Sequence, residues 1–305
     1  MSHLPLQRVL IVGAGTMGRQ IAVSCRLAGL DVVLYDANPH ALDQASREAE
    51  LRAAGFQPDP IAQARQMRIL SQLRVTTDPR AAAADIDLLI EAVPEKLPLK
   101  REVFRQFHAV APPRALFATN TSTLLPSAMA EATGRPAQFA AMHFNLERDL
   151  VELMPHAGTA PDTVDRLQAF CRRIGHVAVV CRCEFPGYVF NNLLMVLNGT
   201  AIALAAQGVA TVEDIDRAWM QAMRMEIGPF GVLDGIGLDT AYRVTEVRAQ
   251  LTRDPQGLKN AEFLKRYVDA GRLGVKTQAG FYDYPDPAYQ RPEFLRGRPG
   301  YCDAA

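Results

Sequence analysis

A glycine-rich turn near the N-terminus constrains the fold of this 305-residue chain more than any other feature. Gly13, Gly15 and Gly18 form a G-x-G-x-x-G pattern between the apolar run 8–12 and the amphipathic stretch 17–28. The pattern predicts a strand, a tight turn and a helix in direct succession. Gly13 permits the tight turn, Gly15 keeps the backbone open to a phosphate group, and Gly18 lets the helix pack closely on the strand.

The end of the second apolar run indicates which ligand this turn binds. The run 31–35 stops directly before Asp36, 23 residues after the first glycine of the motif. A carboxylate near this spacing binds the ribose hydroxyls of a dinucleotide and repels an added 2′-phosphate. We therefore predict NAD rather than NADP, with its pyrophosphate against the backbone of Gly15, Thr16 and Met17. The alternative is a glycine turn in an unrelated α/β protein.

The first half of the chain alternates β-branched runs with amphipathic stretches. Beyond the first two runs, the sequence predicts helices at 39–70 (interrupted at 55–60), 97–110 and 161–173, and strands at 86–93, 115–119, 139–144, 150–154 and 176–181. Strands that alternate with helices form right-handed crossovers and a parallel sheet. The prediction is an α/β N-terminal domain of the Rossmann type with a mostly parallel sheet.

The pattern changes after Cys183. Strand signals almost vanish, and helical periodicity is present at 188–207, 212–223, 238–251 and 258–270. We therefore predict two domains. Residues 1–184 form the NAD-binding domain, and residues 185–305 form an all-α substrate and dimerisation domain.

Composition argues against several classes of function. The chain has 33 Lys and Arg against 33 Asp and Glu, so no long-range basic field exists for nucleic acid or an anionic membrane. The uncharged stretch 185–211 contains several amides, which favours a buried helix over a membrane span. Five cysteines with one C-x-C pair, Cys181 and Cys183, indicate neither a disulfide framework nor a metal site. No secretory signal is visible, so a cytoplasmic location is expected.

One histidine stands apart from the others. His143 ends the apolar run 139–143, and open α/β sheets bind their ligands at the carboxyl ends of parallel strands. A histidine at that place is a candidate general base near neutral pH. The alternative is a buried histidine with a structural role only.

A series of short motifs runs in order along nearly the whole chain. They are Gly13–Gly18, Glu91-Ala-Val-Pro-Glu95 with Leu99-Lys100, Thr119-Asn-Thr-Ser122, His143-Phe144, Leu150-Val-Glu152, Pro186-Gly-Tyr-Val-Phe-Asn191, Gly228-Pro-Phe230, Gly237-Leu-Asp239, Leu273-Gly-Val-Lys-Thr277 and Gly280-Phe-Tyr282. In this order they resemble the L-3-hydroxyacyl-CoA dehydrogenases, in particular the short-chain 3-hydroxybutyryl-CoA dehydrogenases.

The resemblance implies a role for each residue of a site. His143 matches the family's general base, and Glu152 matches the carboxylate that orients it and favours its protonated form. Ser122 and Asn191 match polar groups that fix the substrate oxygen. Asn191 belongs to the second predicted domain, so the resemblance implies a site between the domains. The residues that match positions near the cofactor are Ala92, Glu95, Lys100 and Asn120.

The implied activity is the reversible, NAD-dependent oxidation of a short-chain L-3-hydroxyacyl-CoA to the 3-oxoacyl-CoA. The implied partners are an acyl-CoA and a second copy of the chain, in a homodimer held by the helical domain. Two alternatives stay open: a dehydrogenase of a free 3-hydroxy acid, of the gulonate or carnitine type, and a non-catalytic, crystallin-like dinucleotide-binding protein.

The chain departs from the family pattern beside the base. The family usually has about a dozen residues between the base and its carboxylate. Here Glu152 follows His143 by nine residues, and the usual Phe-Asn-Pro is replaced by Phe-Asn-Leu at 144–146. We therefore expect an altered substrate pocket. Basic groups for the phosphates of CoA are available after the second strand, at Arg47, Arg52, Arg65 and Arg68.

Overall fold

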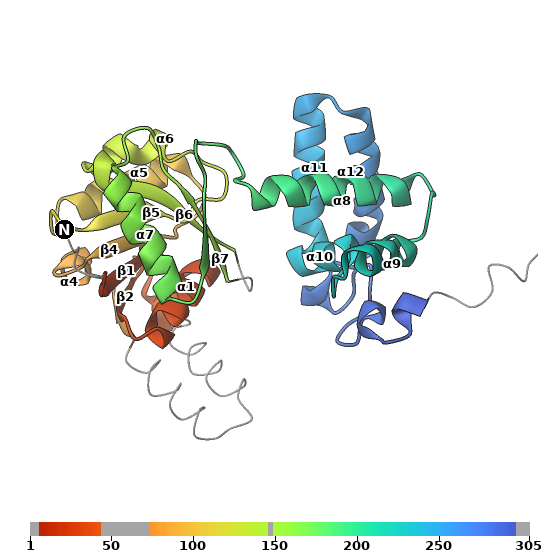
Figure 1. Cartoon of the computed structure of the whole chain (residues 1–305), viewed down its shortest axis with the longest axis horizontal. Coiled ribbons are helices and arrows are strands. Elements are labelled where there is room, and N and C mark those ends of the chain that lie inside the picture. The colour runs from red at the N-terminus through yellow and green to blue at the C-terminus, as the bar shows by residue number, and fades with distance from the viewer. Residues whose placement is uncertain (1–5, 44–72, 146–148, 297–305) are drawn as a thin grey trace, which may run out of the picture. The chain divides into compact units, whose positions relative to one another are not determined.

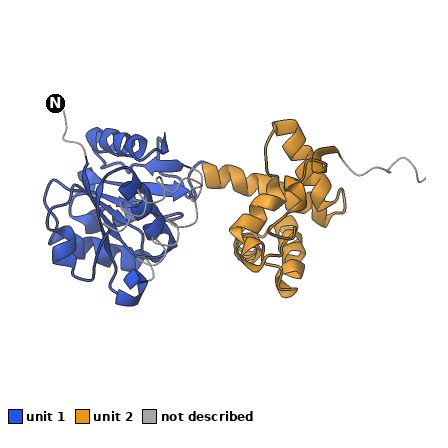
Figure 2. Ribbon diagram, turned by 90° about the horizontal axis from the view of Figure 1, so that it is seen from below, with its two compact units in different colours: residues 1–189 blue, residues 190–305 orange. Residues whose placement is uncertain are grey.

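The computed structural model describes residues 6–43, 73–145 and 149–296. They divide into two compact units, residues 1–189 and residues 190–305 (Figure 2). Each unit has a hydrophobic core of its own, so each is described separately.

In its described residues, unit 1 is built around an eight-stranded sheet with the order β3-β2-β1-β4-β5-β6-β7-β8. The strands are β1 (Arg8–Val12), β2 (Asp31–Tyr35), β3 (Arg74–Thr76), β4 (Leu88–Glu91), β5 (Leu116–Thr119), β6 (Phe139–Asn145), β7 (Leu150–Met154) and β8 (Val177–Val180). Neighbouring strands are parallel except β6 and β7, which are antiparallel. The strand order reverses between β1 and β4, and open α/β sheets bind ligands at such a point.

Helices cover both faces of this sheet (Figure 1). They are α1 (Thr16–Leu27), α4 (Pro79–Ala83), α5 (Leu97–His108), α6 (Ser127–Ala130) and α7 (Pro161–Arg173). On one face, α1 and α7 bury Ile21 and Phe170. On the other face, α4, α5 and α6 enclose a core that contains Phe104 and Phe107. The predicted α/β domain with a mostly parallel sheet is confirmed.

In the described part of unit 2, the regular elements are helices, and the chain after α12 consists of turns, two isolated bridges and short 3-10 helices. Its longer helices are α8 (Phe190–Ala206), α9 (Val212–Met223), α10 (Pro229–Ile236), α11 (Leu238–Thr252) and α12 (Pro255–Asp269). α11 and α12 lie side by side, and α8 packs against α10 and α12 (Figure 1). Phe230, Leu238 and Leu264 form the centre of the core. The predicted all-α second domain is therefore also confirmed.

A buried aspartate joins the helices of unit 2. Asp216 on α9 accepts hydrogen bonds from the backbone N–H groups of Phe230 and Gly231, in the first turn of α10. It also accepts one from the hydroxyl of Tyr282, at 2.8 Å. Burial raises the pKa of Asp216 to about 6, although these hydrogen bonds favour the charged form. The carboxylate thus serves as a structural junction between α9, α10 and the chain after α12.

The long elements lie close to their predicted positions, whereas the short ones do not follow from the sequence. β3, α4, α6 and α10 have eight residues or fewer, which is too short for a clear period. The helix predicted at 188–207 begins only at Phe190, because Gly187 and Tyr188 have left-handed φ values of 81° and 57°. The helix predicted at 39–70 lies outside the described residues from position 44 onward.

Two further features concern the described ranges as a whole. None of their helices combines the length and the apolar character that crossing a membrane requires. Within the same ranges, no three His, Cys, Asp or Glu side chains gather in a way that could hold a metal ion.

Candidate active site

Two glycines lie in the turn between β1 and α1 and a third in the first turn of α1, and packing explains two of the three. Gly13 has a φ of 110°, and a Cβ on it would lie 2.7 Å from the carbonyl oxygen of Ala92, which follows β4. A Cβ on Gly18 would overlap the carbonyl oxygen of Gly13. A Cβ on Gly15 would meet no atom within 4 Å. The described chain thus leaves open space at Gly15, which suits the close approach of a phosphate group to the backbone.

The N-terminus of α1 has the properties of an anion site. Gly15 is its N-cap and provides no side-chain hydrogen bond, and the first turn contains no acidic residue. Gly15 and Thr16 are exposed, and Met17 is half-buried. Uncapped amides at the positive end of a helix dipole bind phosphate groups well. The residues present therefore fit the pyrophosphate of a dinucleotide.

Asp36 is tied to this turn from the end of β2. Its Oδ2 accepts the backbone N–H of Ala14, and its Oδ1 accepts that of Asn38, both at 2.8 Å. The side chain stays half-exposed beside the glycine turn. The carboxylate thus lies at the turn, as the sequence predicts, while its contact with a ribose stays a prediction.

A buried ion pair holds the carboxyl end of β4. Lys100 on α5 and Glu91, the last residue of β4, are 1% and 0% exposed, and Nζ lies 2.7 Å from Oε1. Thr119 at the end of β5 donates to the other oxygen of Glu91, at 2.6 Å. Lys100 Nζ also lies 3.2 Å from the carbonyl oxygen of Val93 and 3.2 Å from Oε2 of Glu95. Burial raises the pKa of Glu91, and the adjacent ammonium group opposes this rise.

Glu95 organises the loop that follows β5. Its Oε1 accepts hydrogen bonds from the hydroxyls of Thr121 and Thr123 and from the backbone N–H groups of Ser122 and Thr123. Burial alone would raise the pKa of Glu95, but these hydrogen bonds and the charge of Lys100 lower it to about 2. The carboxylate is therefore charged throughout the neutral range, and it holds the half-buried Ser122 in a fixed loop.

His143 and Glu152 face each other across the antiparallel pair β6 and β7. They are partners in the strand register, and Nδ1 of His143 lies 3.2 Å from Oε2 of Glu152. Their exposed fractions are 6% and 1%. The side chain of Asn145 donates to the same carboxylate oxygen, at 3.4 Å. The ladder continues to Asn145 and Leu150, so the short separation in sequence leaves the pairing intact.

A tyrosine to which the sequence assigns no role covers the histidine. The ring of Tyr188 is stacked on the imidazole of His143, with centroids 4.6 Å apart and planes inclined by 17°. The Tyr188 hydroxyl donates to the carbonyl oxygen of Thr121, at 2.8 Å. The next residue, Val189, donates its backbone N–H to Oε1 of Glu152, at 2.9 Å. The motif at 186–191 indicated this segment, but no sequence signal indicated the contact with His143.

The structure brings most of the candidate residues to one edge of the sheet. Ala92, Asn120 and Ser122 follow β4 and β5, and Oδ1 of Asn120 accepts the backbone N–H of Phe144, at 2.8 Å. Asn191 lies in the first turn of α8 and belongs to unit 2. The residues proposed for the phosphates of CoA lie outside the described residues: Arg47, Arg52, Arg65 and Arg68.

A buried histidine beside a carboxylate, on the same sheet edge as a turn that fits a pyrophosphate, suits a dehydrogenase that uses a dinucleotide. Comparison with known families agrees with this class. Residues 8–184 match the family description "3-hydroxyacyl-CoA dehydrogenase, NAD binding domain". Residues 187–284 match "3-hydroxyacyl-CoA dehydrogenase, C-terminal domain".

Individual relatives match over almost their whole length. A probable 3-hydroxybutyryl-CoA dehydrogenase of Deinococcus radiodurans is 33% identical over 90% of this chain and 99% of its own. A 3-hydroxybutyryl-CoA dehydrogenase of Bradyrhizobium diazoefficiens is 34% identical over 92% of this chain and 96% of its own. Among solved structures, a diketoreductase superposes with a TM-score of 0.85 and 36% identity, over 92% of this chain and 100% of its own.

The chain belongs to the 3-hydroxyacyl-CoA dehydrogenase family, and it is an NAD-dependent oxidoreductase.

The buried ion pair generates a prediction about stability. Replacing Lys100 by Met leaves Glu91 buried without its counter-charge, and we expect the free energy of unfolding to fall by about 3–5 kcal/mol. Urea unfolding followed by circular dichroism measures this loss. Lys265→Met is the matched control, because it breaks an exposed pair with Asp269 and should change stability little. An equally small change in both variants would contradict the prediction.

The glycine turn generates a prediction about the cofactor. Gly15→Ala adds a methyl group where the chain leaves open space, so the protein should fold with its normal melting temperature. The methyl group should block the pyrophosphate and weaken NADH binding by about tenfold or more, measured by fluorescence titration. Gly18→Ala should instead lower the melting temperature, because its Cβ overlaps the backbone of Gly13. Unchanged NADH affinity in Gly15→Ala would show that no cofactor approaches this turn.

Proposed function

We propose that the protein catalyses the reversible oxidation of a short-chain L-3-hydroxyacyl-CoA to the 3-oxoacyl-CoA, with NAD as the acceptor and His143 as the general base. The observation that carries the proposal is the buried pair of His143 and Glu152 at the carboxyl edge of the sheet. The names of the relatives from Deinococcus radiodurans and Bradyrhizobium diazoefficiens support the short acyl chain.

In this proposal Glu152 decides which nitrogen of His143 reacts. With Nδ1–H donating to the carboxylate, the lone pair of the neutral ring is on Nε2. Nε2 takes the proton of the substrate hydroxyl while C3 loses its hydride. The negative charge of Glu152 stabilises the imidazolium that results. NAD, when bound, supplies the nicotinamide ring that accepts the hydride.

Ser122 and Asn191 are proposed to hold the substrate oxygen. Neutral donors at this oxygen stabilise the negative charge that develops on it. Ser122 suits this task because Glu95 fixes its loop through four hydrogen bonds. Asn191 is assigned to the same task by the resemblance alone.

We also propose a division of labour between the domains. Residues 1–184 bind NAD, and residues 185–305 bind the acyl group and form the dimer. The cofactor contacts are proposed for Gly13, Gly15, Thr16, Met17, Gly18, Asp36, Ala92, Glu95, Lys100 and Asn120. Because the ammonium group of Lys100 is bonded to Glu91 and Glu95, we assign Lys100 the task of holding Glu95 in place. The cytoplasmic location stays a prediction from the sequence.

A second candidate is an enzyme that oxidises a free 3-hydroxy acid, or that reduces a related dicarbonyl compound to the hydroxy compound with NADH as the hydride donor. It is favoured by the likeness to the diketoreductase, which is described as acting on dicarbonyl compounds. The changed segment after His143 agrees with a different substrate. A purely cofactor-binding role is disfavoured, since NAD binding does not require a buried histidine paired with a carboxylate.

The decisive measurement is NADH oxidation by the purified protein with acetoacetyl-CoA, acetoacetate and an uncharged β-diketone side by side. Fast turnover of the thioester supports the proposal, and turnover of the free acid or the diketone alone supports the second candidate. In His143→Gln the rate should fall by about 10²–10⁴-fold while NADH still binds. His156→Gln is the control. The imidazole of His156 contacts the carbonyl oxygen of Pro136, a residue with no role in the proposed reaction, so this variant should keep its activity. Near-normal turnover in His143→Gln would remove this residue as the base.

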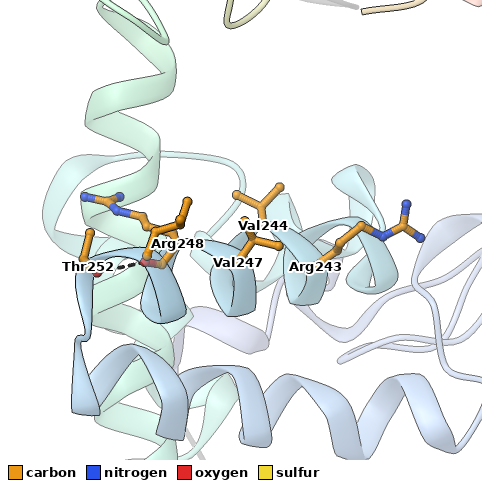
Figure 3. Close-up of a pocket in the computed structure, with 6 residues that line it drawn as sticks. Arg243, Val244, Val247, Arg248 and Thr252 are labelled. Atoms are coloured by element: carbon orange, nitrogen blue, oxygen red, sulfur yellow. Dashed lines mark hydrogen bonds between the residues drawn. The ribbon is translucent and has the colours of Figure 1, made fainter. Parts of the chain in front are cut away.

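We propose that the dimer forms through α11. One groove lies along this helix, and its lining includes Val244, Val247 and Leu251, which are 53%, 48% and 80% exposed (Figure 3). Their spacing of three and four residues places them on one side of the helix. The same side of a second copy is a suitable partner, because a two-fold contact pairs a surface with itself.

The dimer proposal is tested by the oligomeric state of Leu251→Arg. A charge at Leu251, the most exposed residue of this apolar face, should convert dimers to monomers in sedimentation velocity runs at micromolar concentration. Gln221→Arg, at an exposed position on α9 and therefore off the apolar face of α11, is the control and should remain dimeric. A wild-type protein that sediments as a monomer, or a dimeric Leu251→Arg, would overturn the proposal.

A further inference from the structure

We propose that Tyr188 is a positioning residue for the reaction, which holds the imidazole of His143 and the loop before Ser122 in one arrangement. The proposal rests on the role of His143 as the base. Tyr188 lies at the end of unit 1, directly before α8, and it is 2% exposed. All the contacts that carry the argument lie within unit 1.

The first contact concerns the ring of the histidine. The hydrogen bond from Nδ1 to Glu152 fixes how the imidazole is turned within its own plane. It leaves the ring free to tilt about that bond. The stacked ring of Tyr188, 4.6 Å away and inclined by 17°, covers one face and opposes this tilt. The two contacts together fix the direction in which Nε2 points.

The second contact concerns the substrate loop. The Tyr188 hydroxyl donates to the carbonyl oxygen of Thr121, and this carbonyl belongs to the peptide group that leads into Ser122. The Thr121 side chain is held by Glu95 at the same time. Burial raises the pKa of Tyr188, so its hydroxyl stays a neutral donor and takes no part in proton transfer. One side chain thus sets the position of Ser122 relative to His143.

The backbone at this place supports a functional role. Tyr188 has a φ of 57°, a left-handed conformation that costs free energy for a residue with a bulky side chain. It follows Gly187, which also has a positive φ. The strained segment is held by the hydrogen bond from the Val189 N–H to Glu152, at 2.9 Å. Such strain persists where the surroundings enforce it, and it is concentrated at functional sites.

The stacked ring of Tyr188 also stabilises the protonated form of His143 during the reaction. The imidazolium that forms during oxidation lies against the π face of Tyr188, and a cation is attracted to such a face. The charged carboxylate of Glu152 lies at the edge of the same imidazole ring. Removing the aromatic ring therefore affects the chemical step and leaves the binding of NADH alone.

The test compares Tyr188→Leu with Tyr188→Phe, using whichever of the three oxo substrates the enzyme reduces. Tyr188→Leu should lower kcat by about a hundredfold, since a small misplacement of a reacting group has this effect. Its NADH dissociation constant should stay within about twofold of the wild-type value. The primary deuterium isotope effect with NADH labelled at the transferred position should rise, because hydride transfer becomes more limiting. Tyr188→Phe keeps the ring and loses the bond to Thr121, so it should mainly raise the KM of the oxo substrate.

Two controls separate positioning from stability. Tyr282→Phe removes another buried hydroxyl, which bonds to Asp216 in unit 2, and it should lower the melting temperature without changing the isotope effect. In a His143→Gln background, Tyr188→Leu should have no further effect on kcat, because the two residues act through one ring. If Tyr188→Leu does not fold, Tyr188→Met, which keeps most of the volume, replaces it.

Three results would overturn the inference: a normal kcat and isotope effect in the Leu or Met variant, the same loss of kcat in both backgrounds, or an unchanged KM in Tyr188→Phe. None of these results bears on the proposal that His143 is the base. That proposal would be contradicted separately, by normal turnover in His143→Gln.

Discussion

Much of unit 1 depends on one ion pair that is closed off from water. Lys100 and Glu91 join α5 to the end of β4. Because both side chains are almost fully buried, separating them would leave an uncompensated charge inside the domain. From there Glu95 extends the network into the loop after β5. The carbonyl oxygen of Thr121 in that loop accepts a hydrogen bond from the Tyr188 hydroxyl, and the ring of Tyr188 is stacked on the imidazole of His143. A continuous series of short contacts therefore runs from the end of β4, through the loop after β5, to His143.

The glycine turn and the surroundings of His143 differ in which chemical groups carry their charge. At the glycine turn the positive potential comes from the amides at the start of α1, a helix whose first turn contains no acidic residue. Beside His143, the carboxyl group of Glu152 lies 3.2 Å from Nδ1 in a buried setting. Both effects are local, which suits a chain whose lysines and arginines are balanced by its acidic residues.

Structure could be predicted from the sequence where a hydrophobic pattern is long, or where the backbone needs a particular residue such as glycine. Alternating runs of four or more residues gave most strands, and the glycine spacing gave the turn at Gly13. His143 followed from its place near the carboxyl end of a strand, and Glu152 from resemblance. Tyr188 could not be found in this way. Its contact with the histidine requires two successive left-handed residues. The hydrophobic periodicity of the sequence instead predicts that these positions belong to the start of α8. The hydrogen bonds from the loop after β5 to Glu95 could not be predicted either, because they join residues 26–28 positions apart in the sequence.

The antiparallel ladder between β6 and β7 has a consequence for the segment that connects the two strands. Backbone hydrogen bonds set His143 opposite Glu152, so the number of residues that connect the two strands does not enter into their distance. The connecting segment can therefore change in length or sequence without moving His143 away from Glu152. Variation in that segment and constancy of the buried pair are compatible within one fold.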